Sequence, residues 1–130
     1  MTRDETIKLL AILKAAYPSA FRNLTRIEGE AMVGLWSSEF APYPSDIVTA
    51  AVRRIIKKSR FLPSISETLR ETWCVAVDMR ADMLCSAALG RDVPRAELER
   101  VSAVVSRLDA VRASGAKAFG EGRSEPALPA

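Results

Sequence analysis

Residues 2–18 of the chain read TRDETIKLLAILKAAYP, and this stretch contains the signals of one complete α-helix. Thr2 and Glu5 have the spacing of a capping box, in which the two side chains accept hydrogen bonds from free backbone N–H groups at a helix start. Pro18 lacks a backbone N–H and ends the run. The stretch predicts an amphipathic helix over about residues 3–17. Its apolar ridge consists of Ile7, Leu10, Leu13 and Tyr17.

The same capping pattern occurs twice more, at Thr25 with Glu28 and at Ser64 with Glu67. Each pair precedes a run of apolar residues with helical spacing, so we expect helices over about residues 26–40 and 64–89. A break in the second of these near residues 75–78 stays open. A further helix is expected over residues 46–58, with Ser45 as its cap.

A fifth helix is expected to begin at Pro94, a residue favoured in the first turn of a helix. Its apolar stripe consists of Leu98, Val101, Val105 and Leu108. Two heptads are too short to be stable alone, so this helix either packs back onto the bundle or waits for a partner helix. Residues 114–130 are rich in Ala, Gly, Ser and Pro, which predicts a disordered tail.

No alternation typical of β-strands occurs, and the predicted fold class is therefore all-α. We expect a small bundle of four N-terminal helices with a long fourth helix, then a fifth helix and a flexible C-terminal tail. The corresponding organisation is a helical domain over residues 1–89, a partner-binding helix over 90–113 and the tail over 114–130. Trp36 and Trp73 lie on apolar faces and are expected to pack in the core.

The composition of the chain argues against an enzyme. It contains no histidine among 130 residues, which removes the commonest general base and the commonest metal ligand. Cys74 and Cys85 would lie about 16 Å apart along one continuous helix, too far for a disulfide. We therefore expect buried or half-buried free thiols, no metal and no cofactor. The longest apolar runs are far shorter than the roughly 20 residues of a membrane span.

The helix expected over residues 46–58 is the most polarised segment. Its cationic arc consists of Arg53, Arg54, Lys57 and Lys58, with Arg60 in the following loop. Residues 46–70 contain six basic and two acidic side chains, a local charge of +4. This face either contacts DNA or an acidic partner, or is a solvated helix face with cations near its C-terminal end. A helix-turn-helix reader is disfavoured, because two prolines lengthen the connection from the preceding helix.

Four stretches of the sequence resemble the phage helicase loader and inhibitor family. They are residues 5–18 (ETIKLLAILKAAYP), 31–36 (AMVGLW), 43–52 (YPSDIVTAAV) and 59–67 (SRFLPSISE), although Leu62 stands where relatives have proline. The resemblance covers residues 1 to about 75. It implies a helical N-terminal domain and a flexible C-terminal part that engages a hexameric, DnaB-like replicative helicase in the cytoplasm of a bacterial host. It further implies an origin-binding protein and a single-strand-binding protein as partners.

The resulting hypothesis is a non-enzymatic replication adaptor that binds, inhibits and loads a replicative helicase. The stripe on residues 95–113 would bind the helicase, and the basic face of residues 46–58 would be a second contact, to acidic protein or DNA. Two alternatives stay open: a small basic helical DNA-binding or regulatory protein, and a phage-encoded inhibitor of a host system.

Overall fold

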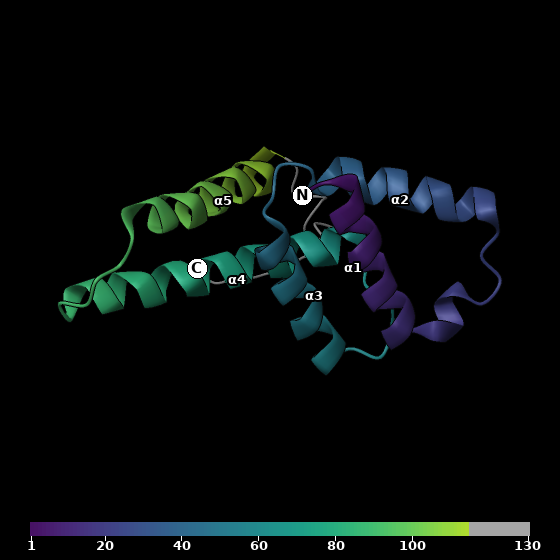
Figure 1. The fold of residues 1–130 in the computed structure, drawn as a ribbon, viewed down its shortest axis with the longest axis horizontal. Coiled ribbons are helices and arrows are strands. Elements are labelled where there is room, and N and C mark those ends of the chain that lie inside the picture. The colour runs from purple at the N-terminus through teal and green to yellow at the C-terminus, as the bar shows by residue number, and fades with distance from the viewer. Residues whose placement is uncertain (115–130) are drawn as a thin grey trace.

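The computed structural model describes residues 1–114, and this part of the chain is helical with no β-strand. The predicted all-α fold is confirmed (Figure 1). The helices are α1 (Arg3–Ala16), α2 (Arg26–Phe40), α3 (Ser45–Lys58), α4 (Ile65–Ala88) and α5 (Arg95–Ser114), with a short 3-10 helix, η1 (Pro18–Phe21), after α1. The predicted tail lies outside the described residues except for Ser114, which belongs to α5.

All three predicted capping boxes are formed, at the starts of α1, α2 and α4. At α4, Glu67 N donates to Ser64 Oγ over 3.0 Å and Ser64 N donates to Glu67 Oε1 over 2.9 Å. The expected cap at Ser45 is wrong. Pro44 has the extended backbone of an N-cap residue, so α3 begins one residue earlier and has no side-chain cap.

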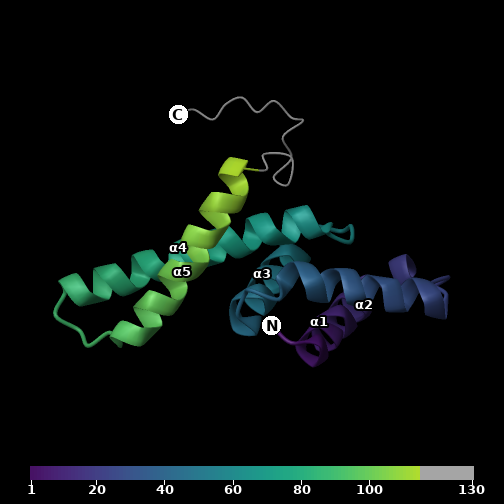
Figure 2. The same ribbon diagram turned by 90° about the horizontal axis from the view of Figure 1, so that it is seen from above.

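The longest helix, α4, is continuous and forms the axis of the molecule (Figure 1). It is followed by Gly90, whose φ of +82° is readily adopted only by glycine. The chain then turns back, and α5 crosses over α4 (Figure 2). On the other side, α3 packs against α4, and α1 packs against both α2 and α3.

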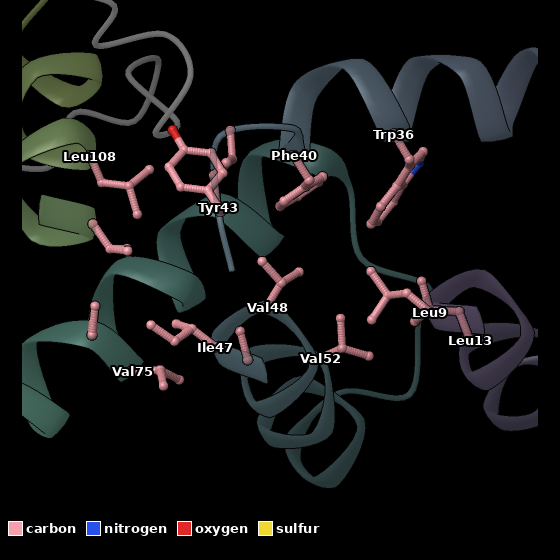
Figure 3. Close-up of a cluster of buried hydrophobic side chains, with 14 of the residues drawn as sticks. Leu9, Leu13, Trp36, Phe40, Tyr43, Ile47, Val48, Val52, Val75 and Leu108 are labelled. Carbon is pink, nitrogen blue, oxygen red and sulfur yellow. The ribbon is translucent and has the colours of Figure 1, made fainter. Parts of the chain in front are cut away.

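The core is one cluster of buried side chains that runs from α1 to α5 (Figure 3). Trp36 is 4% exposed and stacks on Phe40 with ring centroids 5.3 Å apart, which confirms its predicted core position. Val101, Val105 and Leu108 of α5 belong to the same cluster. The fifth helix therefore packs back onto the bundle, and no break in packing separates residues 1–89 from residues 90–113.

Polar contacts fasten α5 at both ends. Near its start, Arg100 donates from Nη1 and Nη2 to the two carboxylate oxygens of Asp46 over 2.9 and 3.0 Å, and it also pairs with Glu97. Hydrogen bonding by this guanidinium lowers the pKa of Asp46. Near its end, the indole N–H of the half-buried Trp73 donates to Asp109 over 2.9 Å.

Candidate macromolecular interfaces

The stripe predicted to bind a partner lies inside the fold. Val101, Val105 and Leu108 are at most 1% exposed, and Leu98 is half-buried. Contact with a partner through these side chains would require α5 to leave α4. The structure therefore offers this stripe as core, and its role in partner binding stays a prediction.

The basic face of α3 is divided into two parts by its neighbours. Lys58 Nζ donates to Glu71 Oε1 over 2.8 Å, and Arg54 Nη1 lies 2.9 Å from Asp78 Oδ2 and 3.8 Å from Glu71 Oε2. Glu71 and Asp78 both belong to α4. Two of the five predicted contact residues are thus neutralised within the molecule.

The other three cations, Arg53, Lys57 and Arg60, are exposed and have no ion pair with any residue of 1–114. Arg53 and Lys57 are one turn apart on the same face of α3, and Arg60 follows the helix end. We call these three residues the basic ridge. It lies at the end of α3 that points away from α5 (Figure 1).

An exposed aromatic ring stands beside the basic ridge. Phe61 is 73% exposed, and the Arg60 guanidinium carbon lies 6.0 Å from its ring centroid. Ser59 Oγ accepts a hydrogen bond from Phe61 N and donates one to Phe61 O, while Tyr17 Oη donates to Ser59 O over 2.8 Å. The loop is therefore held to α1 and presents Phe61 outward. Sequence analysis did not single out this ring, because it lies in a loop without periodicity.

A second surface that sequence analysis missed lies on α1, α2 and the segment between them. We call it the α1–α2 apolar surface, and it consists of Ile7 (44% exposed), Leu24 (40%), Ile27 (79%) and Leu35 (56%). Two adjacent apolar rows follow α2 in the sequence. The structure buries the row that ends in Trp36 and Phe40, and it exposes the row of Ile27 and Leu35. Periodicity alone could not distinguish the two rows.

A groove of about 360 Å³ lies beside this surface, between α1 and α2. Its lining is almost entirely apolar and includes Ile7, Leu10, Phe21, Leu24, Met32 and Val33. Exposed apolar surface concentrated in this way is typical of protein–protein contact.

The described residues give little basis for catalysis. No three His, Cys, Asp or Glu side chains gather within residues 1–114 in a way that could hold a metal ion. Both cysteines are free, but Cys85 is exposed, contrary to expectation, because it lies on the half of α4 that projects beyond α3. Burial raises the pKa of the half-buried Cys74, which disfavours its nucleophilic thiolate form. Among residues 1–114, no helix combines the length and the apolar character that crossing a membrane requires.

The sequence matches the family model for the N-terminal domain of the phage helicase loader and inhibitor proteins over residues 1–69, more than half of the chain. The chain belongs to the phage helicase loader and inhibitor family. This is a family of non-catalytic adaptors, and the resemblance noted from the sequence is thereby confirmed. No curated protein and no solved structure matches the chain.

The extent of the loader-family domain sorts the candidate surfaces. The α1–α2 apolar surface, the basic ridge and Phe61 all lie within the matched residues 1–69. The α5 stripe lies beyond them, although its side chains complete the core of the same bundle.

Proposed function

We propose that this protein binds a hexameric, DnaB-like replicative helicase, holds it inactive and delivers it to a phage origin. The observation that carries the proposal is the family match over residues 1–69. An origin-binding protein and a single-strand-binding protein are the further partners that such a role entails.

The α1–α2 apolar surface is the helicase contact in this proposal. Ile27 and Leu35 are on one side of α2, separated by two helical turns, and both are more than half exposed. Buried apolar side chains at the centre of an interface supply much of the binding free energy between proteins. This surface is available without any rearrangement of the bundle, whereas the α5 stripe is not.

The test uses the full chain and its cognate hexameric helicase, with complex formation measured by mass photometry. The double variant Ile27→Asp/Leu35→Asp should weaken binding by at least about tenfold, because it places two charges in the contact. Leu89→Asp is the matched control, since Leu89 is 64% exposed but lies outside the matched segment. Both variants should keep the wild-type circular dichroism spectrum, because all three positions are exposed.

A complex that tolerates the double variant, with faster amide exchange in α5 on binding, would move the contact to the α5 stripe. Absence of any complex with wild-type protein would overturn the proposed function. Inhibition has its own readout: the ATPase rate of the helicase should fall when the complex forms. An unchanged rate in the complex would refute the inhibitory part.

A further inference from the structure

We propose that the basic ridge and Phe61 together form a binding site for single-stranded nucleic acid. The ridge would contact successive phosphates, and Phe61 would stack on an unpaired base. This inference is independent of helicase binding, since it rests on different residues from those of the α1–α2 apolar surface.

The first step of the argument concerns charge. Five cations follow one another over residues 53–60, and α4 supplies carboxylates to only two of them, Arg54 and Lys58. The side chains of the basic ridge remain without an ion pair among the described residues, on a short linear array. Such an array gains free energy from a polyanion by releasing its counterions.

The second step concerns the aromatic ring. A phenylalanine that is 73% exposed loses the free energy of burial, and here it is fixed in that position from both sides. Its backbone is bonded to Ser59 Oγ, and Ser59 is bonded to Tyr17. A ring held at the surface beside an arginine can stack on a base without first being ordered.

The third step distinguishes nucleic acid from an acidic protein. A protein interface has an apolar core, but the exposed face of α3 offers only the half-buried Ile56 beside the cations. A surface of cations with one ring matches contacts to a phosphate backbone and one base. A paired base inside a duplex has no free face for Phe61, so the site favours a single strand.

The experiment measures fluorescence anisotropy of labelled oligo(dT)20 and oligo(U)20 with the full chain at low salt. Wild-type protein should bind with an affinity that falls as salt rises. Each substitution Arg53→Gln, Lys57→Gln or Arg60→Gln should reduce the slope of log affinity against log salt by about 0.7. Phe61→Ala and Phe61→Leu should each weaken binding by about fivefold or more, whereas Phe61→Trp should retain it. Arg91→Gln is the matched control, because Arg91 is an exposed cation at the far end of α4.

Binding to either oligonucleotide with these dependences supports the proposal, and the stronger of the two tells DNA from RNA. No binding to either at low salt would overturn it. The same holds if Phe61→Ala binds like wild type, if Arg91→Gln loses as much affinity as Arg53→Gln, or if a 20-base-pair duplex binds more tightly. Equal binding of poly-glutamate, with the same loss in Phe61→Ala, would assign the surface to an acidic protein instead.

Discussion

Glu71 is the residue that decides which cations of α3 face solvent unpaired. Its side chain is only 11% exposed and lies within reach of both Lys58 and Arg54. The helical wheel of residues 46–58 places all the cations on one polar arc. The sequence could not show that Arg54 and Lys58 are paired, because their partners lie 13 or more residues away on another helix.

We expect Glu71→Gln to lower the free energy of unfolding by about 1–2 kcal/mol, because it removes the charge that compensates two neighbouring cations. Glu30→Gln is the control: Glu30 pairs with Arg26 at the surface, and its loss should cost less than about 0.5 kcal/mol. Urea unfolding followed by circular dichroism measures both. Equal effects of the two substitutions would show that the Glu71 pairs add nothing to stability.

At the scale of elements, local signals were the most informative part of the sequence. The three capping boxes located the starts of α1, α2 and α4, because a cap depends on residues only three positions apart. The outcome for apolar stripes was different. Those of α2 and α5 look alike in sequence, yet Ile27 is exposed and Leu108 is buried. Periodicity shows that an apolar row exists, but what covers it depends on tertiary packing, here the return of α5 over α4.

The buried position of α5 predicts a large cost for truncating its stripe. Leu108→Ala should lower the free energy of unfolding by about 2–4 kcal/mol, because it removes buried methyl groups and leaves a cavity. Leu89→Ala, at a site that is 64% exposed, should change it by less than about 0.5 kcal/mol. Thermal and urea unfolding of both variants provide the comparison. A small effect of Leu108→Ala would mean that α5 spends much of its time away from the core.

At the scale of the whole molecule, the described residues share one core, whereas the sequence suggested a partner-binding helix set apart from a helical domain. A short stripe and a Gly-containing connection gave that impression. Neither reveals that Val104 and Val105 fill the space over α4. The all-α class followed from the absence of strand patterns, but the number of packed units depended on contacts between distant segments.

Because α5 belongs to the shared core, it should unfold together with α1–α4. The two tryptophans report on opposite ends of the molecule: Trp36 in the core near α1, and Trp73 against α5. In Trp36→Phe and Trp73→Phe variants, the urea midpoint from the fluorescence of the remaining tryptophan should match that variant's circular dichroism midpoint. An earlier fluorescence midpoint confined to Trp73 would show that α5 detaches before the rest.

The hydrogen bond from Tyr17 to Ser59 joins the end of α1 to the loop that carries Phe61. Tyr17 is 7% exposed, and burial raises the pKa of its phenol, so the hydroxyl keeps the proton that it donates. The bond acts as a strut between two faces that would otherwise share only the core. A load applied at Phe61 therefore reaches α1, the same rod that carries Ile7, so the two faces are mechanically in series.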